Sequence, residues 1–336
     1  MRKFIWILAA LALATLACNF AQPAQLTATM LPSPVVQPGQ PEDSQPQPGD
    51  YELTIVNGAD RREVLLHLPP AYDGETRLPL LIVLHGGGGS GQQVRRSTGM
   101  DADADEYGFI VAYPNGSGRL GSALLTWNAG HCCGYAMESA VDDVGLLRVL
   151  IGSMVAHYAV DPARIYITGM SNGGMMAHRA GAELADLVAG IAPVAASVGG
   201  QASAEAALFT PPAPASPVAV IAFNGMADQH VLYEGGLSPM AIDPGRIDLS
   251  VADSLAFWVA ANGCNPLPSS TTRARGNVLI ETYADCDGST AVVQVTIIDG
   301  QHAWPGGRDG LIGDPPSQDV SANQRMLEFF LQHPKQ

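Results

Sequence analysis

Residues 164–174 read RIYITGMSNGG, and this stretch decides the fold of the chain. A short run of β-branched and aromatic residues leads into a serine between glycines, and an apolar helical stripe follows. This order of strand, tight turn and helix is the context in which a G-x-S-x-G pattern indicates a nucleophile elbow. Gly169 and Gly173 allow a turn in which any side chain would collide, so we expect the Ser171 hydroxyl to stand exposed above a sheet edge.

Eight runs have the composition of β-strands, and several are nearly continuous in Val, Ile and Leu. They are residues 53–56, 63–68, 80–84, 109–113, 165–168, 191–194, 218–223 and 292–298. Strands so apolar are buried on both faces, and helical stripes such as Val144, Leu147, Ile151 and Val155 lie between them. The pattern predicts the α/β class, with a mostly parallel central sheet flanked by helices. Ligands of such sheets bind at the carboxyl ends of the strands, where Ser171 lies.

A glycine-rich loop, HGGGGS, occupies residues 85–90 directly after a predicted strand. A tetrahedral intermediate at Ser171 needs preorganised N–H donors, and each donor contributes on the order of a hundredfold or more in rate. We assign these donors to the backbone amides of Asn172 and Gly87, with Gly88 as the alternative to Gly87. Phosphate binding is disfavoured, because no Lys-Ser/Thr pair follows the glycines.

The serine needs a general base, and the chain holds eight histidines. His302 is favoured because it lies in a turn-rich loop, DGQHAWPGG, straight after the last predicted strand. His230 is the main competitor, but it follows Asp228 by only two residues, a position suited to the loop of the acid. Five others fall in a strand, helices, the glycine-rich loop or the tail, where a structural role is expected: His67, His157, His178, His85 and His333.

The third member of a triad must orient the imidazole and stabilise its positive charge. Asp228 follows the seventh predicted strand and lies between the serine and the histidine along the chain, the order expected of α/β-hydrolases. Asp142 and Asp143 are the alternatives, but they precede the nucleophile and open a helix, where carboxylates act as caps and dipole partners. We therefore predict a triad of Ser171, Asp228 and His302.

The N-terminal segment has the layout of an export signal. Residues 1–17 carry two basic residues and then an apolar run too short to anchor in a bilayer. Residues 15–18, TLAC, resemble a bacterial lipobox, which predicts acylation of Cys18; a cysteine that ends a cleaved peptide is the alternative. Residues 18–49 are rich in Pro, Gln, Ala and Ser and predict a disordered linker. Residues 50–336 then form one catalytic domain, outside the cell or on its surface.

The charge of the chain disfavours nucleic acid as a partner. A formal net charge of −15 repels a polyanion. It fits an exported enzyme that releases anionic products, although solubility alone is the simpler explanation. With 47% hydrophobic and 15% charged residues, the chain can fill one sizeable core. The predicted triad requires no cofactor.

Four cysteines remain once Cys18 is assigned to a lipid, and an even number outside the cytosol suggests disulfides. Cys264 and Cys286 flank a polar stretch in the C-terminal third, and we expect them to bond. Cys132 and Cys133 are adjacent, so they form a vicinal bridge, stay free or pair elsewhere. Zinc is disfavoured because the spacing shows no C-x-x-C pair, and no metal site is predicted.

Motifs spread along the chain resemble a known family. They are LHGG at 84–87, TWNAG at 126–130 followed by CCG at 132–134, VDDV at 141–144, GMSNGG at 169–174 and HAWPG at 302–306. Together they are similar to the secreted esterases grouped as polyhydroxybutyrate depolymerases and feruloyl esterases, over about residues 50–334. The resemblance implies an ester hydrolase with the same triad and a C-terminal disulfide between Cys264 and Cys286. Substrate contacts are expected from Trp304, beside the catalytic histidine, and from His85 and Trp127.

Two departures from the family bear on the substrate. The polymer depolymerases often have Cys in the oxyanion loop where this chain has Gly87, and many carry a polymer-binding module that we do not expect here. A feruloyl or acetyl ester on plant polysaccharide, or a soluble short-chain ester, is therefore at least as well supported as a polyester. The alternatives are a serine peptidase of the same fold and a noncatalytic surface-binding lipoprotein.

Overall fold

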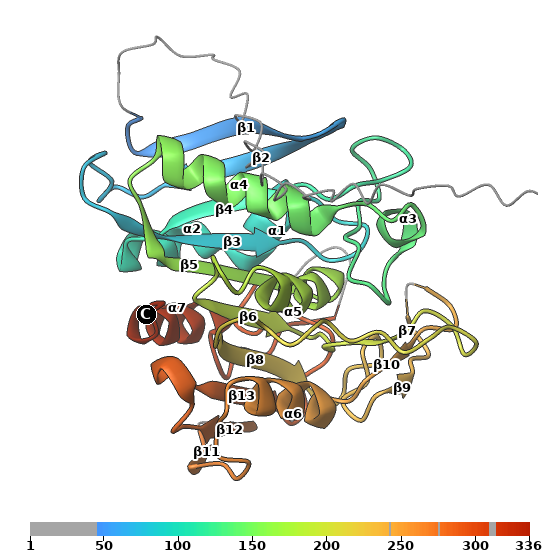
Figure 1. Cartoon of the computed structure of the whole chain (residues 1–336). Helices are drawn as coiled ribbons and strands as arrows, with labels where there is room; N and C mark the ends of the chain where they lie inside the picture. Colours follow the sequence, from blue (N-terminus) through green and yellow to red (C-terminus); the bar gives the residue numbers. More distant parts are fainter. Residues whose placement is uncertain (1–45, 242, 275, 309–313) are drawn as a thin grey trace, which may run out of the picture. The chain divides into compact units, whose positions relative to one another are not determined.

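The computed structural model describes residues 46–336 apart from 242, 275 and 309–313. The predicted signal, most of the predicted linker and Cys18 lie outside these residues. A ten-stranded sheet dominates the described part (Figure 1), in the order β1 (Gly49–Asn57), β2 (Asp60–Leu68), β4 (Ile110–Pro114), β3 (Leu78–Leu84), β5 (Val160–Met170), β6 (Gly190–Val194), β8 (Ala219–Gly225), β13 (Val292–Ile297), β12 (Val278–Tyr283) and β11 (Ser270–Arg273). The six neighbours from β4 to β13 run parallel, and the strands at both flanks are antiparallel.

All eight predicted strands are present, and the prediction of a mostly parallel sheet in an α/β fold is confirmed. Strands β4 and β6 are buried along their whole length, as their continuous apolar composition predicts. The eight predicted runs lack two strands of this sheet, β12 and β11. The four residues of β11 are polar and exposed and form the sheet's edge. The sequence also missed a small sheet of two-residue strands, β7 (Gly200–Gln201), β10 (Ile247–Asp248) and β9 (Gly236–Leu237).

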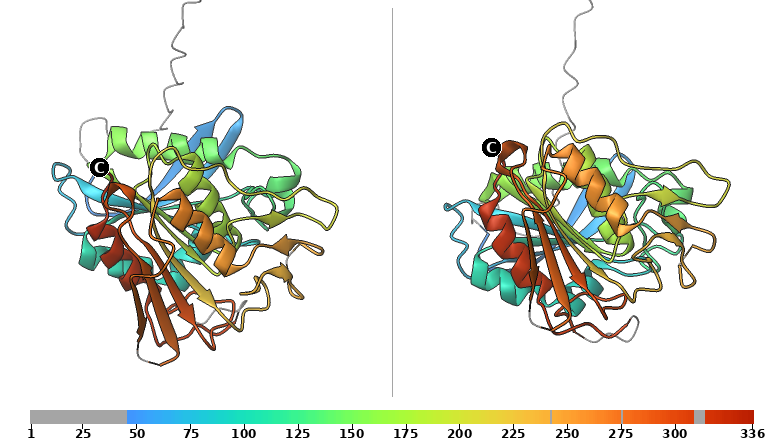
Figure 2. Two further views of the ribbon diagram at one scale, coloured as in Figure 1. Left: turned by 60° about the horizontal axis from the view of Figure 1, so that its bottom comes forward. Right: turned by 90° about the horizontal axis from the view of Figure 1, so that it is seen from below.

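Helices cover both faces of the large sheet (Figures 1 and 2). One face carries α4 (Asp143–His157), α5 (Asn172–Glu183) and α6 (Val251–Ala261), and the other carries α1 (Gly91–Thr98), α2 (Met100–Tyr107) and α7 (Ala322–Gln332). The short helix α3 (Gly134–Glu138) lies in the connection before α4. Side chains of β3 alternate between two cores: Leu80, Ile82 and Leu84 pack on the α4–α5–α6 side, and Leu81 and Val83 pack on the other.

Cys264, just after α6, is bonded to Cys286, just after β12. The disulfide therefore joins a helix on one face to the antiparallel flank of the sheet. No helix within the described ranges combines the length and the apolar character that crossing a bilayer requires.

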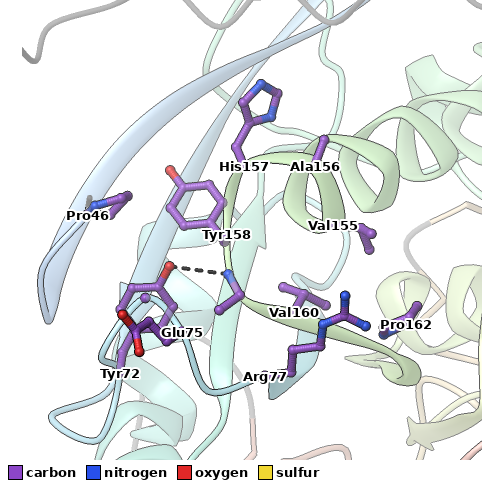
Figure 3. A pocket seen from close by; sticks show the side chains of 12 residues that line it. Pro46, Tyr72, Glu75, Arg77, Val155, Ala156, His157, Tyr158, Val160 and Pro162 are labelled. Carbon is purple, nitrogen blue, oxygen red and sulfur yellow. Dashed lines mark hydrogen bonds between the residues drawn. The ribbon is translucent and has the colours of Figure 1, made fainter. Parts of the chain in front are cut away.

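A cavity of about 370 Å³ opens at the amino edge of the sheet, between the end of α4 and the starts of β3 and β5 (Figure 3). Its wall includes Tyr72, whose hydroxyl accepts a hydrogen bond from the Ala159 amide at 3.3 Å. Arg77 and Tyr158 also line it, and neither side chain has a hydrogen-bond partner among the residues described. The carboxyl end of β5, next to Ser171, lies about 30 Å from this cavity along the strand.

Candidate active site

Ser171 alone forms the turn between β5 and α5. Its backbone has φ 56° and ψ −122°, a combination that residues with a side chain rarely adopt and that marks functional turns. A hydrogen bond from the Ser171 amide to the Val194 carbonyl, 2.9 Å, holds the turn to the next strand. The hydroxyl does not cap α5 and makes no hydrogen bond to any described residue. The side chain is therefore free to act on a ligand.

Gly169 and Gly173 lie where two backbones touch. A Cβ atom at Gly173 would lie 2.5 Å from the carbonyl oxygens of Leu84 and His85, and one at Gly169 would lie 2.5 Å from the Gly173 carbonyl oxygen. Helix α5 thus starts in direct contact with the end of β3, an approach that only glycine permits. The prediction that side chains would collide in this turn is confirmed.

The amides of Asn172 and Gly87 are available to an oxyanion. Asn172 is the first residue of α5, a position whose amide has no partner within its helix and lies at the positive end of the helix dipole. The Gly88 amide, by contrast, donates to the Leu125 carbonyl at 2.8 Å, whereas the Gly87 amide has no partner in the described part of the chain. Of the two glycines considered from the sequence, this favours Gly87.

His85 and Trp127 are buried and hold the glycine-rich loop. His85 Nδ1 donates to the Gly86 carbonyl at 2.8 Å, and its Nε2 accepts from the Gly116 amide at 2.9 Å. Burial lowers the pKa of His85 to about 4, so the ring is neutral, as this pairing requires. Trp127 has no exposed surface and donates from Nε1 to the His85 carbonyl at 3.0 Å. We expected both side chains to contact substrate. Instead, they are buried, and their hydrogen bonds hold the glycine-rich loop in place.

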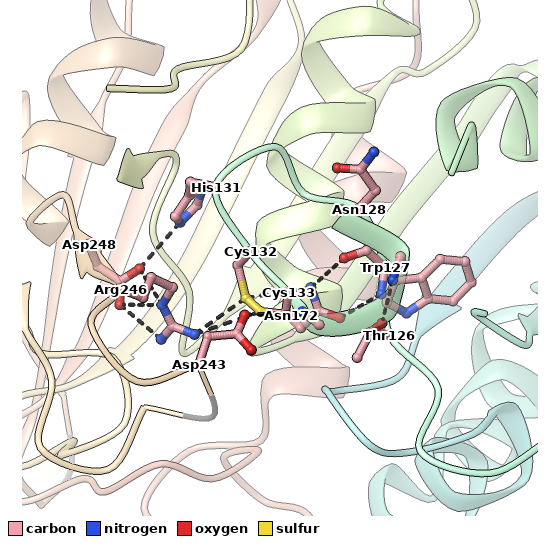
Figure 4. Close-up of a disulfide and its surroundings, with 12 residues drawn as sticks. Thr126, Trp127, Asn128, His131, Cys132, Cys133, Asn172, Asp243, Arg246 and Asp248 are labelled. Atoms are coloured by element: carbon pink, nitrogen blue, oxygen red, sulfur yellow. Dashed lines mark hydrogen bonds and ion pairs between the residues drawn. A yellow bond between two sulfur atoms is a disulfide. The ribbon is translucent and has the colours of Figure 1, made fainter. Parts of the chain in front are cut away.

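The side chain of Asn172 joins the elbow to residues 126–133 (Figure 4). Its Oδ1 accepts from the Trp127 amide at 2.7 Å and its Nδ2 donates to the Trp127 carbonyl at 2.9 Å. The same Nδ2 lies 3.8 Å from Cys132 Sγ. Asn172 therefore offers its amide to the site and uses its side chain to fix the neighbouring loop.

Asp228 and His302 meet at the carboxyl ends of β8 and β13. His302 Nδ1 donates to Asp228 Oδ2 at 2.7 Å, and Asp228 Oδ1 accepts from the amides of His230 and Val231 at 2.7 and 2.9 Å. Three hydrogen bonds fix this buried carboxylate, and the Nδ1–H tautomer leaves the lone pair of His302 Nε2 available to accept a proton. No hydrogen bond joins that Nε2 to Ser171 within the described ranges; such bonds often tighten only when substrate binds.

His230, the competing histidine, stacks on His302 with ring centroids 4.6 Å apart. The Asp228 carboxylate contacts only the backbone amide of His230, whereas it reaches the ring of His302. The acid thus orients His302 and leaves His230 as its packing partner.

Asp142 and Asp143 have the structural roles predicted for them. Asp142 caps α4 by accepting from the Gly145 amide at 2.9 Å. Asp143 is buried, accepts from the Asn128 amide at 2.7 Å and pairs with Arg62 at 3.3 Å. Burial raises the pKa of Asp143 to about 6, against the opposing effects of these two partners.

Trp304 does not line the site as expected. It is 4% exposed and packs in the core on the α7 side, where its Nε1 donates to Asn323 Oδ1 at 2.8 Å. Turning the indole out of this core would break the buried hydrogen bond. Trp304 therefore anchors the His302 loop just after the histidine rather than forming the acyl site.

Sequence reasoning did not single out Arg246, a buried cation that lies between Asp248 and the adjacent cysteines (Figure 4). Its Nε and Nη2 pair with Asp248, each at 2.9 Å, and its Nη2 also donates to the His230 carbonyl at 3.1 Å. Burial alone would raise the pKa of Asp248, but the hydrogen bond from His131 and the charge of Arg246 outweigh it and lower that pKa. A lone arginine in a loop gives no signal in the sequence, so only the tertiary contacts show it.

Arg246 also contacts the adjacent cysteines. Cys132 and Cys133 form a vicinal disulfide, one of the three states considered from the sequence. Arg246 Nη1 lies 3.3 Å from Cys132 Sγ. Asn172 bonds to the same loop at Trp127. Arg246 therefore connects the segment that carries Asp228 and His230 to the loop beside the nucleophile.

Comparison with known proteins agrees with this geometry. Residues 63–259, more than half of the chain, match the family described as esterase PHB depolymerase. The chain belongs to this family. Feruloyl esterase B of Piromyces equi is 33% identical over 256 residues, which make up 74% of this chain and 44% of that protein. Poly(3-hydroxybutyrate) depolymerase of Ralstonia pickettii is 28% identical over 249 residues, 69% of this chain and 49% of that protein. The chain thus spans less than half of each of these two relatives.

Solved structures share the fold. Acetyl xylan esterase from Aspergillus awamori superposes with a TM-score of 0.54 at 14% identity, covering 81% of this chain and 94% of that one. The protein named sOPH gives a TM-score of 0.56 at 17% identity and covers 88% and 90%. At such identities the likeness concerns the fold alone, which is that of the α/β-hydrolases.

Proposed function

We propose that this protein is a serine carboxylic-ester hydrolase. His302 takes the proton of Ser171, and the hydroxyl attacks the ester carbonyl. The amides of Asn172 and Gly87 bind the oxyanion, and His302 returns the proton to the departing alcohol as the ester bond breaks and the acyl-enzyme forms. Water, deprotonated by the same imidazole, then attacks the acyl-enzyme, which releases the acid and frees Ser171. The observation that carries the proposal is the 2.7 Å hydrogen bond from His302 to Asp228, at the same sheet edge as the Ser171 turn.

The substrate class proposed is a feruloyl- or acetyl-type ester, or a polyhydroxyalkanoate or other polyester. It is supported by the names of the relatives, which include a feruloyl esterase and a poly(3-hydroxybutyrate) depolymerase. Export from the cell and acylation at Cys18 belong to the same proposal, and both rest on the sequence of the first 18 residues.

The decisive experiment is Ser171→Ala, assayed with p-nitrophenyl acetate and with an aminoacyl-p-nitroanilide. We expect wild-type protein to cleave the ester in preference to the anilide, and the variant to lose about a million-fold in kcat while unfolding at the same temperature. Wild-type-like turnover by the folded variant would remove Ser171 from the mechanism. Preference for the anilide would make the protein a peptidase of the same fold.

A further inference from the structure

A second cavity lies on the catalytic edge of the sheet. Its volume is about 670 Å³, within the range of small-molecule sites. One wall is the β1–β2 turn with the start of β2, a second is the loop after β4, and Tyr135 of α3 closes a third side. Because β2 runs antiparallel to β4, the start of β2 meets the carboxyl end of β4 at this edge.

This cavity shares a wall with the glycine-rich loop. Leu125 lines the cavity, and its carbonyl accepts the amide of Gly88, the neighbour of the proposed oxyanion donor. Gly116 lines it too, and its amide donates to His85 Nε2. In the sheet, only β3 separates β4 from β5, so the loop after β4, the near wall of the cavity, follows a strand that lies two strand spacings, about 10 Å, from β5 and its elbow. A substrate that reacts at the elbow would have to pass the glycine-rich loop to reach this wall.

Three polar groups of this cavity make no hydrogen bond to any residue that the structure describes, although the Tyr135 ring lies beneath the Arg119 guanidinium, 5.9 Å from the ring centroid. Ser117 is 9% exposed, and its buried hydroxyl has no hydrogen-bond partner in the part of the chain that the structure describes. Within the same ranges, the Arg61 guanidinium and the Tyr135 hydroxyl also make no hydrogen bond. Leaving a buried hydroxyl unsatisfied costs about 1–3 kcal/mol. The Ser117 hydroxyl is therefore matched to a ligand that can donate or accept a hydrogen bond at this point.

The charges of the cavity do not favour an ionic ligand. The Arg62 guanidinium is used by Asp60 at 2.5 Å and Asp143 at 3.3 Å. Arg61 is then the one cation of this wall without an ion pair among the residues described, and the carboxylates of Glu63 and Asp142 line the same space. The cavity thus offers the hydroxyls of Ser117 and Tyr135, the guanidinium of Arg61 and the carboxylates of Glu63 and Asp142. This mixture of donors and acceptors matches a neutral ligand whose own hydroxyls both donate and accept hydrogen bonds.

We propose that this cavity is a subsite for a polyhydroxylated unit, a sugar residue, of the ester substrate. The inference rests on the proposed ester hydrolysis and adds that the ester is part of a glycan that runs along the catalytic edge from Ser171, past the glycine-rich loop, to Arg61 and Tyr135.

The first test measures binding without catalysis. The Ser171→Ala protein is titrated calorimetrically with unesterified xylotetraose, a neutral glycan. We expect binding at millimolar concentration or tighter, weakened about tenfold when Arg61→Gln or Tyr135→Phe is added, because each removes a hydrogen-bonding group. The matched controls are Arg77→Gln and Tyr158→Phe, whose side chains line the amino-edge cavity (Figure 3) and lack partners in the described residues in the same way. They are expected to leave binding unchanged.

The second test is kinetic and uses otherwise wild-type protein. Arg61→Gln and Tyr135→Phe are expected to raise KM about tenfold for acetylated xylotetraose, with kcat unchanged, and to leave hydrolysis of p-nitrophenyl acetate unaffected, since that ester is too short to reach the cavity. Absence of xylotetraose binding, or equal losses in the Arg77 and Tyr158 controls, would overturn the subsite. Failure of the hydrolase proposal would show separately, as unchanged ester turnover in Ser171→Ala.

Discussion

The two halves of the site are held together in different ways. On the nucleophile side, Ser171, Asn172 and the glycine-rich loop are fixed by contacts between backbones and by buried side chains that bond to backbone, such as Asn172 to Trp127. On the acid–base side, Asp228 and His302 stand on loops after β8 and β13 and meet through one side-chain hydrogen bond.

This difference has a physical consequence. On the nucleophile side, the groups that position the proposed oxyanion donors are also packed parts of the core, so we expect stability and turnover to depend on the same residues. On the acid–base side, the imidazole can be removed without opening the sheet, because its loop is anchored independently by Trp304 and Asn323. Substitutions should therefore separate rate from stability on one side and couple them on the other.

The largest effect is expected for His302→Ala, about a million-fold in kcat, because the base is lost. Thermal unfolding should shift little, as the anchor at Trp304 remains. His230→Ala is the matched variant: its ring stacks on His302 but does not contact the Asp228 carboxylate, so most activity should persist. Steady-state kinetics with p-nitrophenyl acetate decide the ranking, and the reverse order would move the base to His230.

Asp228→Asn should lower kcat about ten-thousand-fold, since the amide cannot stabilise the imidazolium and favours the wrong tautomer. KM should change little, and the retained Oδ1 can still accept the amides of His230 and Val231, which preserves the fold. Asp142→Asn is the control, expected to affect the melting temperature through the α4 cap more than the rate. A larger loss of rate in Asp142→Asn than in Asp228→Asn would show that Asp228 is not the acid of the triad.

Asn172→Ala tests the nucleophile side. The amide of residue 172 stays, but the amide and carbonyl of Trp127 lose their buried partners, at a cost of about 2–4 kcal/mol. We expect a drop in melting temperature together with a fall in kcat of roughly 10–100-fold, because the loop beside the oxyanion hole shifts. Calorimetry and kinetics on one preparation check this; unchanged stability with reduced rate would erase the contrast between the two sides.

The smallest effect on turnover is expected for removal of the Cys264–Cys286 disulfide, which belongs to neither side. Replacing both cysteines by Ser should destabilise the fold by about 3 kcal/mol in the chain-entropy model, while kcat with p-nitrophenyl acetate stays at the wild-type level. Reduction of the wild-type protein should lower the melting temperature similarly. Non-reducing peptide mapping that finds both thiols free, or either one joined to Cys132 or Cys133, would contradict the bridge.

The sequence by itself determined the elements whose physics is local. The elbow could be predicted because a strand and a helix joined by one serine need glycines on both sides of the turn. In the structure, a Cβ atom at Gly169 or Gly173 would lie 2.5 Å from a carbonyl oxygen. The central strands were readable because burial on both faces demands continuous apolar runs. The choice between Gly87 and Gly88, by contrast, depended on a distant carbonyl, that of Leu125.

Only the tertiary structure decided which of the candidate side chains are buried in the core. Trp127 and Trp304, aromatic residues within the motifs, suggested substrate contacts. Both are buried in the core, and each indole N–H is hydrogen-bonded. An indole stabilises the fold most when it is buried in this way. Arg246 gave no pattern at all and yet links the two halves of the site. Periodicity and turn chemistry report on immediate neighbours along the chain, whereas the burial of a side chain and its bonding partners are set here by other segments, up to 114 residues away.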